Sequence, residues 1–207
     1  MHGRTALSDL LVLCTANVAR SPLLAARLSV ELVRRLGPDA LAITSGGTDA
    51  LFGAPAASGS IEVAAGWGVD LHEHSATPIS YLDLAAPALV VTMERRHSRA
   101  VAARTPTAAA RTFTWPELVT TLTERVDPAD GDALPAPVPA DDTARQRLEA
   151  AVTLAHAHRP RRLPRRRAEV PDPIRGGQDV YDALGERFDR QVTAVAGWLF
   201  GPGPASG

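Results

Sequence analysis

The chain has 207 residues, 45% of them hydrophobic, which is enough for one domain with a substantial core. Its formal net charge of -1 at pH 7 gives no reason to expect nucleic acid or a membrane surface as a partner. The sequence contains no lysine, which excludes Schiff-base chemistry and Walker-type nucleotide hydrolysis. The single cysteine, Cys14, excludes an intramolecular disulfide and predicts a reducing, cytoplasmic setting. The apolar run Leu10–Leu13 is too short for a signal peptide or a membrane-spanning helix.

Predicted strands and helices alternate along most of the chain. Short apolar runs predict four buried strands at Leu10–Leu13, Leu41–Thr44, Leu89–Thr92 and Arg111–Thr114. The spacing of apolar residues predicts helices over Pro22–Leu36, Ala56–Gly66, Glu94–Ala103, Thr143–Ala157 and Val180–Phe200. This order predicts an α/β fold with a parallel sheet, in which ligands bind beyond the carboxyl ends of the strands. Cys14 follows the first predicted strand and is therefore expected at that edge of the sheet.

The segment 127–169 differs in composition from the rest of the chain. Asp127–Asp142 is rich in proline, alanine and aspartate, which predicts a loop. Arg159–Arg167 carries six arginines interrupted by two prolines, which is incompatible with a regular helix. Such a basic cluster can bind acidic partners or nucleic acid, but we interpret it as a solvated connector.

A run near the N-terminus, CTANVARSP, places five residues between Cys14 and Arg20. A tight loop between a strand and a helix can direct backbone N–H groups and the positive end of the helix dipole at an anion. The same field favours the thiolate of Cys14, and the guanidinium of Arg20 can hold two phosphate oxygens. A cysteine at a strand end is more often a plain core residue. Its spacing to Arg20 and Ser21 at this junction instead predicts a site that cleaves phosphate esters.

Cleavage through a cysteine also needs an acid that protonates the leaving oxygen and a base that activates water afterwards. Asp172 lies between two prolines, Pro171 and Pro173, which stiffen the backbone around its carboxylate. Taken alone, this segment would be read as an ordinary Asp-Pro turn. Together with Cys14 and Arg20, Asp172 becomes the predicted general acid.

These motifs resemble those of the low-molecular-weight protein tyrosine phosphatases. The matching segments are the loop at 14–22, Thr44–Thr48, Asp70–Ala76, Val91–Glu94 and Asp172-Pro173. The resemblance implies a flavodoxin-like, phosphotyrosine phosphatase I type of fold, with a four-stranded parallel sheet flanked by helices and with no metal or cofactor. It covers residues 8–126 and 168–200, so the chain is expected to form one domain over 1–207 with an insertion at about 127–169.

The resemblance also implies roles for individual residues. Cys14 would be the nucleophile that becomes phosphorylated, and Arg20 would clamp the transferring phosphoryl group. Asp172 would act as the general acid and then as the general base. Ser21 would donate a hydrogen bond to the sulfur of Cys14, which stabilises the thiolate or makes it a better leaving group.

The phosphate-binding loop itself would be formed by Thr15, Ala16, Asn17, Val18, Ala19 and Ser21. Asn17 would hold this loop from outside, with support from Ser45 and His74, although plain structural roles fit those two residues as well. The family usually has glycine at the position of Ala16, so either the backbone avoids a positive φ there or some strain is accepted. Ala19 replaces a frequent second cysteine, which removes reversible disulfide protection of Cys14.

The wall that contacts the substrate departs furthest from the family pattern. The family often has aromatic residues after its Asp-Pro pair, whereas this chain has Ile174 and Arg175. Phe52, in the loop after the second predicted strand, is the nearest aromatic candidate. We expect Arg175 to favour a more anionic or less aromatic ester than phosphotyrosine.

The sequence leaves two other functions open. One is an arsenate reductase that relies on an external thiol, because the chain lacks the further cysteines that intramolecular versions need. The other is a catalytically weak module that binds phosphate ligands without turnover. We favour the phosphatase, acting as a monomer or weak homodimer on a phosphorylated protein or a small phosphate monoester, because Asp172 supplies the acid that ester hydrolysis needs.

Overall fold

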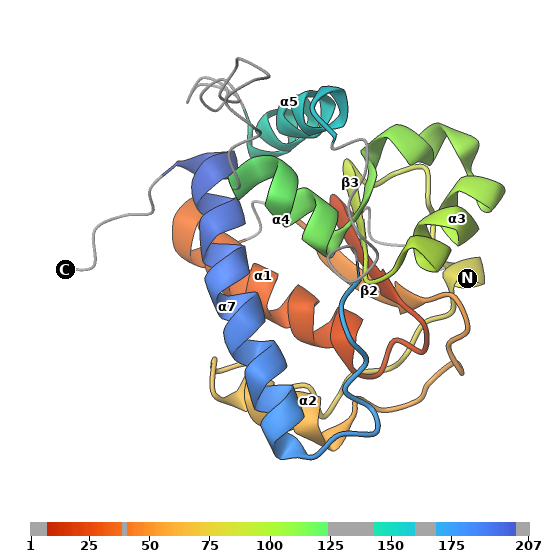
Figure 1. The fold of residues 1–207 in the computed structure, drawn as a ribbon, viewed down its shortest axis with the longest axis vertical. Coiled ribbons are helices and arrows are strands. Elements are labelled where there is room, and N and C mark those ends of the chain that lie inside the picture. Colours follow the sequence, from red (N-terminus) through yellow and green to blue (C-terminus); the bar gives the residue numbers. More distant parts are fainter. Residues whose placement is uncertain (1–7, 39–40, 124–142, 160–168, 202–207) are drawn as a thin grey trace.

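A computed structural model of the protein describes residues 8–38, 41–123, 143–159 and 169–201. Its strands are β1 (Leu10–Cys14), β2 (Ile43–Gly47), β3 (Leu89–Thr92) and β4 (Thr112–Thr114). Its α-helices are α1 (Arg20–Leu36), α2 (Ser58–Ala65), α3 (Arg95–Arg104), α4 (Trp115–Thr123), α5 (Ala144–Ala157) and α7 (Gln178–Phe200). The described residues also contain two short 3-10 helices, η1 (Ile79–Tyr81) and η2 (Pro106–Arg111) (Figure 1).

The four strands form one parallel sheet in the order β2-β1-β3-β4. The predicted α/β class and the four-stranded parallel sheet are therefore confirmed. β1 is a central strand, and its register places Cys14 opposite Gly47 of β2. Since all strands run the same way, their carboxyl ends meet at one edge, and Cys14 lies on that edge.

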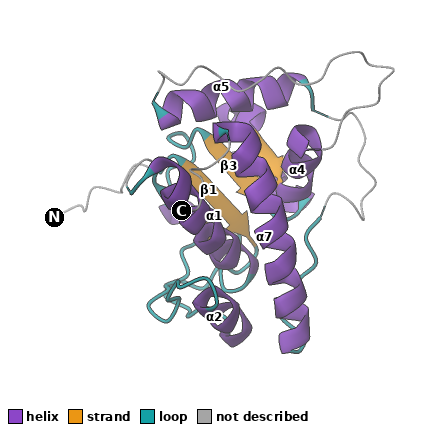
Figure 2. Cartoon of the chain, turned by 90° about the vertical axis from the view of Figure 1, so that its left-hand side faces the viewer, coloured by secondary structure: helices purple, strands orange, loops and turns teal. Residues whose placement is uncertain are grey.

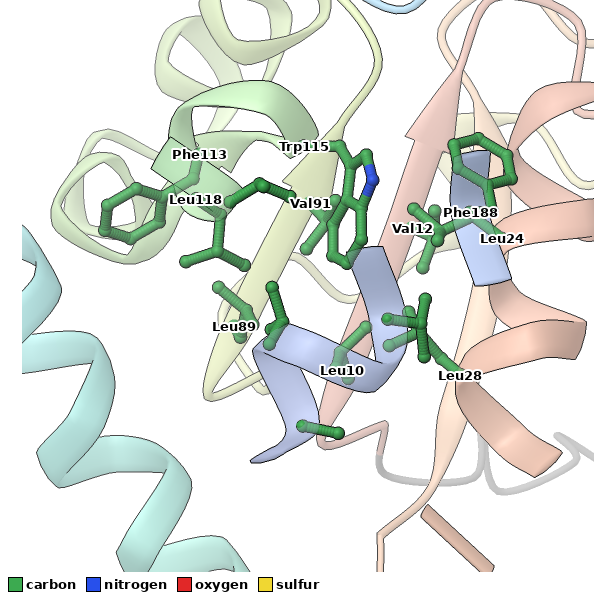
Figure 3. Packing of buried hydrophobic residues seen from close by; sticks show 14 of the residues in the cluster. Leu10, Val12, Leu24, Leu28, Leu89, Val91, Phe113, Trp115, Leu118 and Phe188 are labelled. Atoms are coloured by element: carbon green, nitrogen blue, oxygen red, sulfur yellow. The ribbon is translucent and has the colours of Figure 1, made fainter. Parts of the chain in front are cut away.

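Side chains alternate along each strand, so each face of the sheet packs into its own hydrophobic core. Leu10, Val12 and Cys14 face the larger core, which α1, α4, α5 and α7 cover; Leu11 and Leu13 face a smaller core with Val101 of α3. Figure 2 shows α1 and α7 side by side across one face of the sheet. Figure 3 shows residues of β1, β3, α1 and α7 packed together in the larger core.

The predicted helices are observed with their ends shifted by at most two residues, and the first strand extends one residue further, to Cys14; three other differences have a physical reason. The second strand begins at Ile43 rather than at Leu41 and continues to Gly47, because its pairing with β1 extends along the whole of that strand. The last strand begins at Thr112, because Arg111 ends the helix η2. Helix α4 was not predicted, since its apolar residues follow β4 without a loop and strand and helix patterns merge there.

The C-terminal helix packs through the predicted stripe. That stripe is buried and consists of Leu184, Phe188, Val192, Val195 and Leu199.

Within the described residues, no helix is both long enough and apolar enough to span a membrane.

Part of the expected insertion is a helix. Thr143 caps α5 through a capping box with Gln146, in agreement with the predicted helix. The predicted loop Asp127–Asp142 lies outside the described residues, and so does the cluster Arg159–Arg167 apart from its first member. Arg159 donates to the Thr112 carbonyl at 2.7 Å and places its guanidinium over the Phe113 ring. This arginine is therefore part of the packed fold rather than of a solvated connector.

Candidate active site

A five-residue loop between β1 and α1 has its carbonyl groups bonded to the surrounding protein. The Cys14 and Thr15 carbonyls accept from the amides of Thr48 and Asp49, and the Val18 carbonyl accepts from the Ala57 amide. In a trans peptide the N–H points away from the C=O of the same unit. The amides that follow these three carbonyls therefore point inward, and they belong to Thr15, Ala16 and Ala19. The loop has the polarity of an anion cradle.

The sulfur of Cys14 is buried at the base of this loop and meets two polar groups. The Asn17 amide donates to Sγ at 3.2 Å, and the Ser21 Oγ lies 3.0 Å from it. The Asn17 Nδ2, which can only donate, approaches the same hydroxyl at 3.0 Å. The one proton of Ser21 is therefore free to point at the sulfur or at the Gly46 carbonyl, which is farther away at 3.2 Å. Both groups can therefore donate a hydrogen bond to the sulfur.

Asn17 supports the loop through both its backbone and its side chain. It has φ 56° and is the one non-glycine residue with positive φ in the described part of the chain. Asparagine tolerates this left-handed conformation better than most residues, and Ala16 avoids it. The side chain donates to Ser45 Oγ at 2.8 Å and accepts from the Thr77 amide at 2.9 Å. His74 Nε2 lies 2.6 Å from the Asn17 carbonyl, so that ring nitrogen carries the proton.

Arg20 begins α1 and is almost completely buried, with 2% of its side chain exposed. Its Nη1 donates to Glu94 Oε1 at 2.7 Å and to the Val170 carbonyl at 3.0 Å. Its Nη2 donates to Asp172 Oδ2 at 2.8 Å. Burial opposes the ionisation of Glu94, but hydrogen bonds from Arg96 and Arg20 outweigh it and lower the pKa of this carboxyl. Glu94 is thus a permanent anion that orients Arg20.

Asp172 reaches the loop because its segment is attached to the edge of the sheet. The Val170 amide donates to the Met93 carbonyl at 2.9 Å, directly after β3. This bond and the contact of Arg20 with the Val170 carbonyl place Asp172 beside Arg20, although 152 residues separate them. In contrast to Glu94, Asp172 is well exposed, with 43% of its side chain accessible. Its carboxylate can therefore give way to a ligand.

Thr15 connects the site to two residues that the sequence did not single out. Its hydroxyl accepts from Arg20 Nη2 at 3.3 Å and from Arg96 Nη2 at 2.8 Å. The hydroxyl proton is then left for His97 Nε2, which lies 3.1 Å away. His97 is therefore neutral with its proton on Nδ1, and burial, the largest cause, lowers its pKa to about 4. A histidine within an arginine-rich helix carries no sequence signal for this role.

The residues expected to form the substrate wall are exposed. Phe52 is 64% exposed, and its ring centroid lies 5.3 Å from that of Tyr81, which is 66% exposed and was not predicted. Ile174 and Arg175 are also exposed, on the segment after Asp172. The two rings are tilted by 39° to each other and offer an exposed apolar surface for an aromatic ring. No cluster of three or more potential metal ligands occurs among the residues described.

The family model for low molecular weight phosphotyrosine protein phosphatases matches residues 9–135. A probable low molecular weight protein-tyrosine-phosphatase EpsP of Ralstonia nicotianae is 28% identical over 124 residues, which cover 60% of this chain and 78% of that protein. The EpsP of Ralstonia solanacearum is 30% identical over 112 residues, 54% of this chain and 73% of that protein. The matched model ends before Asp172, which therefore depends on the geometry above.

Solved structures of phosphatases share the fold at low sequence identity. Vibrio vulnificus Wzb in complex with benzylphosphonate has a TM-score of 0.60 and 20% identity, and the match covers 92% of this chain and 98% of that one. The low molecular weight protein tyrosine phosphatase from T. tengcongensis has a TM-score of 0.61 and 23% identity, with 89% and 95% covered. The YwlE arginine phosphatase from Geobacillus stearothermophilus has a TM-score of 0.60 and 19% identity, with 90% and 89% covered.

Proposed function

Because the chain belongs to the low molecular weight phosphotyrosine protein phosphatase family, it is a phosphatase, and we propose that Cys14, Arg20 and Asp172 carry its reaction. The observation that carries this assignment is the contact of Arg20 with Asp172 at 2.8 Å, beside the loop that surrounds the Cys14 sulfur. It joins a nucleophile, a cation and an acid from distant parts of the chain in one site.

In the first step the Cys14 thiolate attacks phosphorus, and the bond from phosphorus to the ester oxygen breaks. The protonated carboxyl of Asp172 gives its proton to the leaving oxygen, so an alcohol or phenol departs. Phosphoryl oxygens take the place of the Asp172 carboxylate on Arg20, while the inward amides of the loop hold the other oxygens. The product is a phosphocysteine.

In the second step water attacks the phosphocysteine. Asp172, now a carboxylate, accepts a proton from that water, and the bond from phosphorus to sulfur breaks. Inorganic phosphate leaves, and the thiolate is regenerated. The hydroxyl of Ser21, 3.0 Å from the sulfur, stabilises the negative charge that returns to it.

For the substrate we propose aryl phosphates, including phosphotyrosine in proteins. The names of the EpsP relatives support this class, and so does the exposed pair of Phe52 and Tyr81. We further propose a cytoplasmic protein that acts as a monomer or weak homodimer, since Cys14 has to stay reduced to act as a nucleophile.

The test is hydrolysis of p-nitrophenyl phosphate, without added metal and between pH 5 and 7, by the wild type and by Cys14→Ser. We expect turnover by the wild type and none by the variant, which keeps the loop and should still bind vanadate. The outcome that contradicts the proposal is comparable activity in Cys14→Ser. A folded wild type that consumes thiol only with arsenate, and releases no phosphate, would favour an arsenate reductase instead.

A further inference from the structure

A second arginine lies at the rim of the phosphate loop and is not used in the mechanism above. Arg96, in the first turn of α3, donates from Nε to Glu94 Oε2 at 2.8 Å and from Nη2 to Glu94 Oε1 at 3.1 Å. The same Nη2 donates to Thr15 Oγ1 at 2.8 Å. Its side chain is nevertheless 58% exposed. Arg96 is therefore fixed at its inner edge and open to solvent at its outer edge.

Arg96 and Arg20 are close neighbours. Their Nη2 atoms lie 2.8 Å and 3.3 Å from the one hydroxyl oxygen of Thr15, so they are no farther apart than these distances together, about 6 Å. The pKa of Arg96 is raised, first by its hydrogen bond with Glu94 and also by the charges of Asp49 and Asp172. The guanidinium of Arg96 thus stays charged beside that of Arg20.

Arg96 keeps an unused donor beside the site when substrate occupies Arg20. In the free protein, Arg20 and Arg96 are balanced by Glu94 and Asp172. When substrate binds, a phosphoryl group takes the place of Asp172 on Arg20, and Asp172 carries a proton. Glu94 is then the one carboxylate that these two arginines share. The Nη1 of Arg96 has no hydrogen bond within the described residues, and it can receive a second anion.

We infer that Arg96 forms a second anion subsite, which selects phosphorylated residues that have an acidic residue close by in the same peptide. The inference rests on the proposed function, since it concerns the substrate of the same site. An extended peptide rises about 3.3 Å per residue, so side chains two positions apart are separated by about 7 Å on one face. Because the Nη2 atoms of the two arginines lie within about 6 Å of each other, a phosphoryl group on Arg20 leaves Arg96 within reach of a carboxylate side chain two positions away in the peptide.

The experiment measures kcat/KM on two phosphotyrosine peptides that differ only in having glutamate or glutamine two positions before and two positions after the phosphotyrosine. For the wild type we expect a preference of about fivefold for the glutamate peptide, expressed mainly in KM and reduced at 0.5 M salt. Arg96→Gln should lose this preference, so that the ratio of kcat/KM between the two peptides falls to about one. Arg96→Lys, which retains the charge, should keep part of it.

Arg104→Gln is the matched control, because it removes the same charge from the other end of α3, about 12 Å away along the helix. It should keep the full preference. The inference is overturned if the wild type treats both peptides alike, or if Arg96→Gln slows both peptides equally, which would make Arg96 a positioning residue for Arg20. A wild type that hydrolyses neither the peptides nor p-nitrophenyl phosphate would instead refute the proposed function.

Discussion

Helix α1 takes part in two clusters of arginines and carboxylates. One stabilises the fold, and the other lies in the proposed active site. Near its C-terminal end, Glu31 accepts hydrogen bonds from Arg27, Arg34 and Arg35 at 3.1, 2.6 and 2.6 Å. Its side chain is 3% exposed, so these partners cannot be exchanged for a ligand. Burial opposes its ionisation, but the three arginines outweigh it and lower the pKa of Glu31 to about 2. This cluster therefore contributes to the stability of the fold and leaves no place for a ligand.

At the N-terminal end of the same helix, Arg20 is also held by carboxylates, but they are not equivalent. Glu94 is well covered and orients one side of the guanidinium, whereas Asp172 is 43% exposed on the other side. The exposed carboxylate can leave and return as the site changes its occupant. The same pair of residue types therefore gives stability or catalysis according to whether the carboxylate is exposed.

The sharpest test of this contrast is a substitution of Asp172, the carboxylate that a ligand can displace from Arg20. Asp172→Asn removes the proposed acid. The value of kcat/KM for phenyl phosphate, whose phenolate is a poor leaving group, should therefore fall by about 10³-fold. The loss on p-nitrophenyl phosphate should be below about tenfold, because that leaving group needs little protonation. The free energy of unfolding, measured in urea, should change by less than about 1 kcal/mol, since the pair is exposed on one side. Equal losses on both esters would remove Asp172 from the acid role.

A substitution of Glu31, the buried carboxylate, should instead lower the stability strongly and change the activity little. Glu31→Gln leaves three arginines without their buried anion, and the free energy of unfolding at pH 7 should fall by about 3 kcal/mol. Because Glu31 has a depressed pKa, its contribution is complete above about pH 4.5 and is lost as the pH falls toward 2. Activity of the folded variant should stay within about twofold of the wild type.

Glu186→Gln is the matched control for Glu31→Gln, because Glu186 pairs with Arg190 at 3.7 Å on an exposed face. It should cost less than about 0.5 kcal/mol. A comparable loss of stability in both variants would mean that burial is not what distinguishes the Glu31 cluster.

The smallest predicted effect concerns the buried histidine behind the loop. The pKa of His97 is lowered to about 4, so the folded state resists a proton that the unfolded chain takes up near pH 6.5. Its stabilisation is therefore present above about pH 6.5 and is lost as the pH falls toward 4. Between pH 6.5 and 5 the wild type should lose about 2 kcal/mol more than His97→Gln, whose amide oxygen can still accept from Thr15. Parallel pH profiles for the two proteins would contradict this assignment.

The local part of the site could be predicted from the sequence because it is built within a few residues. Cys14, Arg20 and Ser21 belong to one turn between a strand and a helix, and strand β1 follows from a short apolar run. The parallel sheet and the stripe of α7 could be predicted for a similar reason, since alternation and helical spacing are local patterns. The Asp-Pro segment, taken together with the Cys14 and Arg20 motif and the resemblance to the family, was enough to make Asp172 a candidate for the acid.

The partners of Arg20 were decided only by the tertiary structure. Glu94, 74 residues away, and Val170, 150 residues away, contact Arg20 because β1 and β3 are neighbours in the sheet and the Val170 segment is bonded to the end of β3. Strand order brings such residues together, and no pattern within one segment specifies it. The neutral state of His97 likewise depends on burial under elements far apart in the chain. The sequence thus determined the loop and the cysteine that we propose as the nucleophile. The tertiary structure decided which charges orient the arginine, because electrostatic partners depend on distance in space and on exposure to water.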